Sequence, residues 1–351
     1  MHVIASRKLG GAESFFTRLV SGLAAAGEEV MVGCRRGSMV CSALPDTFSK
    51  FQVPMLGGWD VWSRWKLGRT IAGYRPDIVQ TYMARATVLT HVPRGTAAVH
   101  IARLGGYYNI SRFRHASAWV GNTRGICDYL VRNGLPASRV FYIGNFVDSP
   151  AAVTAAQHLE LQQQLCLPPD ARVILAAGRM IKKKGFDTLL EAFSQLPERV
   201  DGRELRLLLL GAGPLREELY AQAGRLGIAA RVHWAGWQTV LAPYFALADV
   251  FVCPSRHEPL GNVILEGWAH QRPVISTRTA GAEELIHDGR DGVLVAIDAS
   301  REMAQAIEVM LHDEDRRLAL ARAGSARISN EFSKERIISS YIELYHRLTD
   351  S

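Results

Sequence analysis

The first part of the chain alternates short apolar runs with segments whose apolar residues recur at helical spacing. Residues 12–26 are of the second kind, because their apolar side chains fall on one stripe of a helix. The stripe consists of Phe16, Leu19, Val20 and Leu23. Six apolar runs predict strands: His2–Ala5, Glu29–Gly33, Pro76–Thr81, Ala97–Ala102, Ala118–Asn122 and Val140–Ile143. This alternation is typical of a parallel sheet covered by helices.

The second part repeats the pattern after a change in composition. Residues 149–170 open with Ser149-Pro150 and are rich in Ala and Gln, which indicates a linker followed by one helix. Further strands are predicted at Val173–Ala177, Leu205–Leu210, Val232–Ala235, Val250–Cys253, Pro273–Ser276 and Gly292–Val295. Helices are predicted from Lys184 to Leu196, from Leu215 onward, and from Lys334 to Leu348.

We therefore predict an α/β protein with two doubly wound, Rossmann-like domains of similar size. The length of 351 residues agrees with two domains at roughly 150 residues each. We expect an N-terminal domain over residues 1–148, a C-terminal domain over 149–330, and a helix over 331–351 that crosses back to the N-terminal domain. Ligands of such sheets bind at the carboxyl ends of strands, so the cleft between the domains is the expected site.

The positive charge is concentrated in the first part of the chain. Residues 1–148 contain 18 Lys and Arg against 8 Asp and Glu, whereas residues 149–351 contain 23 against 26. A basic domain beside a nearly balanced one indicates different partners, and the basic one favours an anionic partner.

Several protein classes are excluded by composition. No apolar run reaches about 18 residues, so no membrane-spanning helix is expected. The charges of the first residues follow the apolar stretch, which is the wrong order for a signal peptide. The five cysteines are scattered without a C-x-x-C pair, and the eleven histidines include no H-E-x-x-H motif. We expect a cytoplasmic protein with reduced thiols and no zinc site.

Two carboxylates eight positions apart form the strongest candidate site. Glu258 is expected in the loop after the strand Val250–Cys253, and Glu266 about one turn into the next helix. Gly261-Asn262 places backbone N–H groups at that helix start, which suits an anion. An acidic residue just beyond such a start can accept hydrogen bonds from sugar hydroxyls. The alternative is an exposed loop glutamate and a helix-dipole glutamate.

A second motif places two cations at a strand–helix junction. The strand ends at Gly178, and Arg179 and Lys184 flank the turn into the following helix. Two such cations can clamp a diphosphate and stabilise the charge that develops when it departs. The alternative is a solvated basic turn, which is our interpretation of Lys182 and Lys183.

Together these motifs resemble the retaining glycosyltransferases of family 4, which have the two-domain GT-B fold. The resemblance covers almost the whole chain and is strongest in the second half. Besides the two motifs above, it rests on Gly10-Gly11-Ala12-Glu13, Pro76-Asp77-Ile78-Val79, Asn145-Phe146-Val147-Asp148, Leu210-Gly211-Ala212-Gly213-Pro214-Leu215 and Ala248-Asp249-Val250-Phe251-Val252-Cys253-Pro254-Ser255.

The resemblance implies a role for each matching residue of the donor site. Glu266 would hold the ribose hydroxyls of a nucleotide-sugar, and Glu258 would contact hydroxyls of the donor sugar. Arg179 and Lys184 would bind the diphosphate. Backbone contacts around the phosphates would come from Gly261, Asn262 and Val263, and from Gly11 in the N-terminal domain, which approaches closely because it lacks a side chain.

The N-terminal domain departs from the family pattern at one position. Many relatives carry a histidine at the end of a strand near the reacting sugar. Here either His100 is that residue, shifted, or Arg103 takes its place. The two point to opposite faces of the strand. We favour Arg103 as the catalytic and acceptor-binding residue, because it lies at the strand end, and we interpret His100 as a half-buried strand histidine.

Aromatic residues add two further candidates in the N-terminal domain. Tyr107 and Tyr108 follow Arg103 and are interpreted as acceptor-binding residues or as a surface loop. Three tryptophans at a spacing of three, with interleaved basic residues, suit a helix on an anionic membrane surface. They are Trp59, Trp62 and Trp65 with Arg64, Lys66 and Arg69. The alternative is that the tryptophans pack on the domain or line an acceptor groove.

The resemblance implies transfer of a sugar from a nucleotide-diphosphate-sugar, with retention of configuration, to an acceptor hydroxyl. The residues with catalytic roles would be Arg103, Glu258, Arg179 and Lys184. A UDP-sugar is favoured as co-substrate, without another cofactor. No metal is expected, because we interpret Asp313-Glu314-Asp315 as a solvated helix start.

The basic N-terminal domain favours an anionic glycan or glycolipid acceptor of bacterial envelope polysaccharide synthesis. It also allows a peripheral position on the inner face of the cytoplasmic membrane. No groove-reading motif favours a nucleic acid. The alternative function is a nucleotide-sugar epimerase of the same fold.

Overall fold

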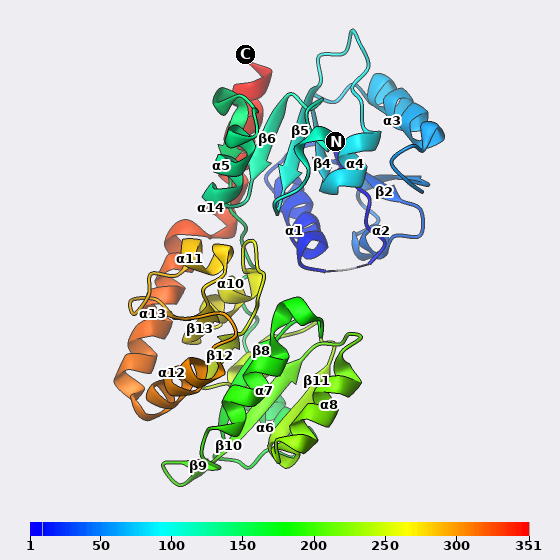
Figure 1. The fold of residues 1–351 in the computed structure, drawn as a ribbon. Coiled ribbons are helices and arrows are strands. Elements are labelled where there is room, and N and C mark those ends of the chain that lie inside the picture. Colours follow the sequence, from blue (N-terminus) through cyan, green and yellow to red (C-terminus); the bar gives the residue numbers. More distant parts are fainter. Residues whose placement is uncertain (9, 351) are drawn as a thin grey trace. The chain divides into compact units, whose positions relative to one another are not determined.

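The computed structural model describes residues 1–8 and 10–350 and divides into two compact units (Figure 1). The N-terminal unit consists of Met1–Phe146 and Phe332–Ser351, and the C-terminal unit of Val147–Glu331. The sequence-based boundaries fall after residues 148 and 330, whereas the contacts divide the chain after Phe146 and Glu331.

The N-terminal unit is built on a seven-stranded parallel sheet in the order β3-β2-β1-β4-β5-β6-β7. The strand order reverses direction at β1, beside β4, as in doubly wound folds. The strands are β1 (His2–Ile4), β2 (Met31–Arg35), β3 (Ser49–Val53), β4 (Ile78–Tyr82), β5 (Val99–Leu104), β6 (Ala118–Gly121) and β7 (Val140–Tyr142).

Helices connect and cover these strands. They are α1 (Gly11–Ala25), α2 (Met39–Ala43), α3 (Val61–Tyr74), α4 (Met83–Leu89), α5 (Arg124–Arg132) and α14 (Lys334–Thr349), with short 3-10 turns η1 (Ile110–Arg112) and η2 (Ala137–Arg139). The predicted apolar stripe of α1 is buried. The last helix, α14, drawn in red in Figure 1, returns to this unit and packs against α1. A Cβ on Gly22 of α1 would lie 2.5 Å from Ile338 Cδ1, so the two helices approach closely.

The C-terminal unit contains a second sheet, with a parallel core in the order β11-β10-β8-β12-β13-β14 and β9 antiparallel to β10. Its strands are β8 (Arg172–Ala177), β9 (Arg199–Val200), β10 (Arg203–Leu210), β11 (Val232–Gly236), β12 (Val250–Cys253), β13 (Val274–Thr277) and β14 (Val293–Val295). The order reverses at β8, beside β12. The loops after these two adjacent strands therefore share one edge of the sheet.

The helices of this unit alternate with the strands. They are α6 (Ala155–Gln164), α7 (Phe186–Ser194), α8 (Arg216–Arg225), α9 (Ala242–Leu247), α10 (Asn262–Ala269), α11 (Ala280–Leu285), α12 (Ser300–His312) and α13 (Glu314–Glu331), with 3-10 turns η3 (Lys182–Lys184) and η4 (Ala229–Arg231). The unit's core lies between the sheet and these helices and includes Leu189, Leu207 and Ile307.

The predicted fold class, two doubly wound α/β domains, is confirmed. Strand β3 has no counterpart among the predicted strands. Its sequence, Ser-Lys-Phe-Gln-Val, is half exposed because the strand lies at the edge of its sheet. Edge strands carry Lys and other polar residues that prevent pairing with further chains, and these residues obscure the apolar signal. None of the helices in residues 1–8 and 10–350 is long and apolar enough to cross a membrane.

Candidate functional site

In the C-terminal unit, Lys184 and Glu258 form an ion pair at the ends of β8 and β12. Lys184 closes the turn η3, and its Nζ donates a hydrogen bond to Glu258 Oε2. The two side chains are 21% and 15% exposed, so the pair is accessible from solvent but largely sheltered. Burial by itself lowers the pKa of Lys184, but the carboxylates of Glu258 and Glu266 outweigh it and raise the pKa. Lys184 is therefore a fixed positive charge at neutral pH.

Close backbone contact brings the η3 turn against the loop that carries Glu258. Gly185 has φ +64°, and a Cβ there would lie 1.9 Å from the carbonyl oxygen of Pro254. Only glycine fits at this point. The backbone N–H groups of Arg256 and His257 also donate to the carbonyl of Lys183, at 2.8 and 3.2 Å. The Lys-Gly pair of the motif thus sets where the ammonium of Lys184 lies.

The start of α10 lies in the same group of loops. Gly261 precedes the helix with φ +95°, and a Cβ there would lie 2.8 Å from Ile264 Cδ1. The first N–H groups of any helix lack intrahelical acceptors and carry partial positive charge, which attracts anions. Asn262 and Val263 occupy this first turn and are half-buried. Glu266 follows one turn later, close enough to Lys184 to raise its pKa.

Arg179 differs from Lys184 in its surroundings. It follows Gly178 directly after β8, and its side chain is exposed. In the part of the chain that the structure describes, no residue forms a hydrogen bond or an ion pair with its guanidinium. Lys182 and Lys183 are exposed as well. Lys184 is therefore paired, whereas Arg179 is available to a new anion without breaking an existing contact.

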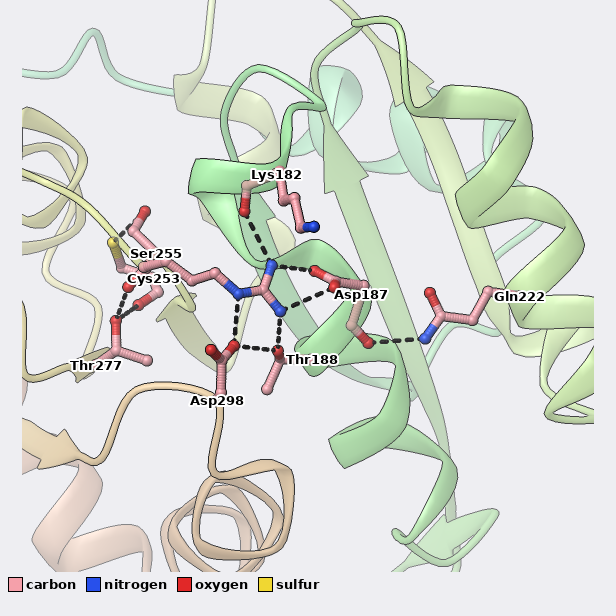
Figure 2. A network of polar contacts seen from close by, with 9 residues as sticks. Lys182, Asp187, Thr188, Gln222, Cys253, Ser255, Thr277 and Asp298 are labelled. Carbon is pink, nitrogen blue, oxygen red and sulfur yellow. Dashed lines mark hydrogen bonds and ion pairs between the residues drawn. The ribbon is translucent and has the colours of Figure 1, made fainter.

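Arg256 anchors the Glu258 loop and was missed by the sequence analysis. Its guanidinium donates two parallel hydrogen bonds to Asp187, at 2.7 and 2.8 Å, and one to Asp298 at 2.5 Å. Figure 2 shows these acceptors together with Thr188 and the carbonyl of Lys182, which accept at 2.9 Å each. The only sequence signal was a basic residue two positions before Glu258.

The same network extends to both sides of the loop. Gln222 of α8 donates to the carbonyl of Asp187 at 3.0 Å, and Thr277 of β13 donates to the carbonyl of Ser255 (Figure 2). Burial by itself raises the pKa of Asp187, but its hydrogen bonds and ion pair with Arg256 lower it. Bidentate pairs of this kind fix geometry as well as charge. The loop that carries Glu258 is therefore held rigidly to the start of α7.

In the N-terminal unit, Arg103 is buried among uncharged partners. It lies near the end of β5 and is only 5% exposed. Its Nε donates to Tyr341 Oη of α14 at 2.9 Å, its Nη2 donates to Asn145, and its guanidinium lies 4.1 Å above the ring of Phe15. Arg103 thus links the sheet, α1 and α14. Its expected contact with substrate stays a prediction.

His100 lies in the interior of the same unit and is 2% exposed. Its Nε2 is 3.1 Å from Thr81 Oγ1, and its ring packs beside His115 at a centroid distance of 5.4 Å. Burial lowers the pKa of His100 to about 3, with smaller contributions from His115 and His91. His100 is therefore a neutral interior residue. It is more deeply buried than the half-buried strand histidine that we expected.

The remaining N-terminal candidates lie nearer the surface. Tyr107 and Tyr108 are 42% and 37% exposed, and Gly11 is exposed at the start of α1. Burial raises the pKa of Tyr108, and both Arg103 and Glu13 act on it electrostatically, so these three residues are neighbours.

Two further buried polar residues of the N-terminal unit were not predicted as site residues. Glu13, in the first turn of α1, is 7% exposed. Asn122, directly after β6, is 4% exposed, and its Oδ1 has no hydrogen-bond partner among the described residues. Its position at the end of a predicted strand was the available signal.

Comparison with known proteins identifies the family. Residues 171–313 match the family described as "Glycosyl transferases group 1", and residues 9–149 match "Glycosyltransferase Family 4". The chain is 36% identical over 350 residues to "Lipopolysaccharide core biosynthesis glycosyltransferase LpsE" of Rhizobium meliloti (strain 1021), covering 96% of both chains. The chain is a family 4 glycosyltransferase. A second protein of that organism, named as the lipopolysaccharide core glycosyltransferase LpsD, is 29% identical and covers 96% of this chain and 95% of its own.

A solved structure shares the fold of this glycosyltransferase. The crystal structure of HepE from Anabaena, in complex with UDP and glucose, superposes with a TM-score of 0.83 at 20% identity and covers 99% of this chain and 100% of its own. The GT-B fold predicted from the resemblance is confirmed. The family and both relatives are transferases, so the alternative of an epimerase is not favoured. Within residues 1–8 and 10–350, no group of three or more His, Cys, Asp or Glu residues is arranged to hold a metal ion.

Proposed function

We propose that this glycosyltransferase transfers a sugar from a nucleotide-diphosphate-sugar, with UDP favoured, to a hydroxyl of an anionic glycan or glycolipid in bacterial envelope polysaccharide synthesis. The observation that carries the proposal is the Lys184–Glu258 pair beside the start of α10. The names of the relatives, which refer to lipopolysaccharide core biosynthesis, support the pathway class. The complex of HepE with UDP and glucose supports the choice of nucleotide.

The donor diphosphate would be bound by three positive groups of the C-terminal unit. They are the ammonium of Lys184, the exposed guanidinium of Arg179 and the N–H groups of Asn262 and Val263 at the α10 start. Before donor binds, Glu258 holds Lys184 in position. Glu258 would accept hydrogen bonds from the donor sugar and Glu266 from the ribose. In the N-terminal unit, Gly11 is proposed to approach the diphosphate through its backbone.

In the proposed reaction the bond between the anomeric carbon and the diphosphate oxygen breaks, and the acceptor oxygen bonds to the same face of the sugar. The departing phosphate oxygen takes the proton of the acceptor hydroxyl, so configuration is retained. Lys184 and Arg179 stabilise the negative charge that grows on the leaving diphosphate, which is the task a metal ion performs in other enzymes. The reaction proposed here needs neither a metal nor a further cofactor.

The acceptor is proposed to bind to the N-terminal unit, where Tyr107 and Tyr108 are exposed beside Arg103. The excess of basic residues in positions 1–148 supports an anionic acceptor. Arg103 would contribute its positive charge to acceptor binding or hold the neighbouring acceptor-binding side chains in position. A cytoplasmic location, peripheral on the inner face of the membrane, is part of the proposal.

A thermal-shift series with UDP-, GDP- and ADP-sugars tests the donor assignment. A ligand that binds only the native state raises the melting temperature, so a UDP-sugar should give the largest shift. Glu266→Ala should reduce that shift because it removes the acceptor for the ribose hydroxyls. Glu284→Ala serves as a comparison on the neighbouring helix α11. An equal shift in wild type and Glu266→Ala, or no shift with any nucleotide-sugar, would contradict the proposal.

A further inference from the structure

Helix α3 of the N-terminal unit has one face in the core. Ser63, Leu67 and Ile71 recur every four positions and are fully buried. Leu67 and Ile71 belong to a core cluster with Val53 of β3 and with Leu89 of α4. The packing of α3 therefore fixes which of its residues face outward.

The opposite face of α3 and the loop before it carry large apolar side chains in solvent. Trp62 and Trp65 are 51% and 55% exposed, and Val61 is 75% exposed. Trp59, in the preceding loop, is 93% exposed, and Leu56 is 69% exposed. We call these five residues the tryptophan surface. The five residues are close in sequence, and the ring centroids of Trp62 and Trp65 lie 6.3 Å apart. A group of large exposed apolar side chains on a folded domain marks a site of interaction with a partner or a membrane.

The loop of the tryptophan surface is tightly fastened to the helix. Asp60 caps α3 by accepting from Ser63 N at 2.9 Å, and its other carboxylate oxygen accepts from Ser63 Oγ at 2.6 Å and from Leu56 N at 3.0 Å. Ser63 Oγ in turn accepts from Met55 N at 2.9 Å. The loop and helix that carry the exposed tryptophans are thus already ordered, so binding needs little further ordering of the chain.

Basic residues accompany the tryptophans. Between residues 56 and 74 the chain contains Arg64, Lys66 and Arg69 and a single acidic residue, the capping Asp60. The ammonium of Lys66 lies 5.4 Å from the ring of Trp62, and the guanidinium of Arg69 lies 5.4 Å from the ring of Trp65. Within residues 1–8 and 10–350, none of these three cations forms an ion pair with a carboxylate. Lys66 Nζ donates to the carbonyl of Gln52 at 2.9 Å, and Arg64 Nη2 lies 3.2 Å from His91 Nε2. These partners carry no negative charge, so the positive charge of the cations can attract an external anion.

We propose that the tryptophan surface docks on a membrane that contains anionic phospholipids. Tryptophan rings prefer the boundary between headgroups and acyl chains, and adjacent Lys and Arg side chains reach the phosphates. The excess of positive charge in residues 1–148 complements such a surface. The inference rests on the proposed function in one respect, because a lipid-linked acceptor gives the docking its purpose. The two can fail separately.

Vesicle flotation with the purified full-length protein tests the docking. We expect the protein to float with phosphatidylcholine vesicles that contain phosphatidylglycerol, to float weakly with phosphatidylcholine alone, and to lose binding as salt increases. The triple variant Trp59→Ala/Trp62→Ala/Trp65→Ala should bind the anionic vesicles about tenfold more weakly than wild type. Trp237→Ala is the matched control, because this tryptophan of the C-terminal unit is also 55% exposed, and it should bind as wild type does.

A second variant and a spectroscopic readout separate the contributions. Arg64→Gln/Lys66→Gln/Arg69→Gln should lose the preference for phosphatidylglycerol while the tryptophans still meet the bilayer. Brominated lipids should quench the fluorescence of wild type and of Trp237→Ala more than that of the triple tryptophan variant. Melting curves with and without UDP-sugar establish that each variant is folded and binds donor.

Several results would overturn the docking proposal. They are equal vesicle binding by wild type and the triple tryptophan variant, no binding of wild type to anionic vesicles, or concentration-dependent dimerisation that the triple variant abolishes. If vesicles bind as expected but no nucleotide-sugar shifts the melting temperature, the docking stands and the proposed donor chemistry fails. The reverse combination leaves the donor site standing and removes the membrane surface.

Discussion

Each unit of this glycosyltransferase carries a cation near or beyond the end of a central strand, and the two cations have opposite surroundings. Lys184 of the C-terminal unit is partly exposed and pairs with a carboxylate, beside a helix start. Arg103 of the N-terminal unit is buried and is bound by a phenol, an amide and an aromatic ring. A basic residue near the end of a predicted strand is thus an accessible charge in one unit and a buried, structural residue in the other.

The source of the partners explains the difference. Glu258 and Arg256 belong to the same sheet edge as Lys184 and come from the next loop along that edge. Tyr341, the partner of Arg103, lies 238 positions away in α14. A site assembled from neighbouring strand ends leaves room for a ligand, whereas a helix from the end of the chain fills the space around Arg103.

The comparison is tested most strongly by Lys184→Ala. We expect the rate of sugar transfer at limiting donor to fall by about 10²–10³-fold, because a charge aimed at the leaving group is removed. The matched control is Lys183→Ala, an exposed lysine of the same turn, which should transfer sugar at the wild-type rate. Steady-state kinetics with a UDP-sugar measure the effect. Equal rates for the two variants would remove Lys184 from the donor site.

Arg103→Met tests the other half of the comparison. It removes the donor of the buried Tyr341 hydroxyl and one donor to Asn145, so we expect the N-terminal unit to lose about 2–3 kcal/mol of stability in chemical denaturation. Lys184→Met should cost less than Arg103→Met, because Lys184 and Glu258 are 21% and 15% exposed whereas Arg103 is only 5% exposed. If Arg103→Met melts like wild type yet loses sugar transfer, Arg103 acts on the substrate rather than on α14.

Arg256→Ala tests whether the Glu258 loop needs its anchor. We expect the KM for donor to rise about tenfold, with a smaller change in kcat, because Glu258 and Lys184 would lose their fixed positions. Arg256→Lys should recover only part of the loss, since an ammonium cannot donate two parallel hydrogen bonds to Asp187. A variant with normal kinetics and a lowered melting temperature would restrict Arg256 to stability.

The pH dependence of stability gives the smallest expected effect. The pKa of His100 is lowered to about 3 and that of His91 to about 4, both by burial first, so the unfolded chain binds more protons than the folded chain below pH 6.5. Stability is therefore complete above pH 6.5 and decreases as pH falls toward 3. From pH 6.5 to 5.5 the loss due to the buried His100 alone is about 1 kcal/mol.

His100→Gln should flatten the pH dependence in this window, and His257→Gln, an exposed histidine of the C-terminal unit, should not. Denaturant titrations at several pH values measure the slope. An unchanged slope in His100→Gln would show that His100 does not contribute to the pH dependence of stability.

Much of the fold could be predicted because the two units follow local patterns closely. The stripe of α1, the run of β12 and the final helix all lie within a few residues of their predicted bounds. Strand β3 was not predicted because an edge strand is half exposed and carries polar residues. The motif around Lys184 and Glu258 was recognisable because its residues are close in sequence and belong to adjacent strand ends.

The sequence by itself determined the two doubly wound units and the residues of the donor motif, since periodicity and turn chemistry act over short stretches of chain. It also determined that the tryptophans of α3 share one face. Only the tertiary structure decided that this face is exposed, because burial depends on which side of α3 meets the sheet through Leu67 and Ile71. Likewise, only packing decided that Arg103 is an anchor within its unit, because its partner Tyr341 comes from a distant helix.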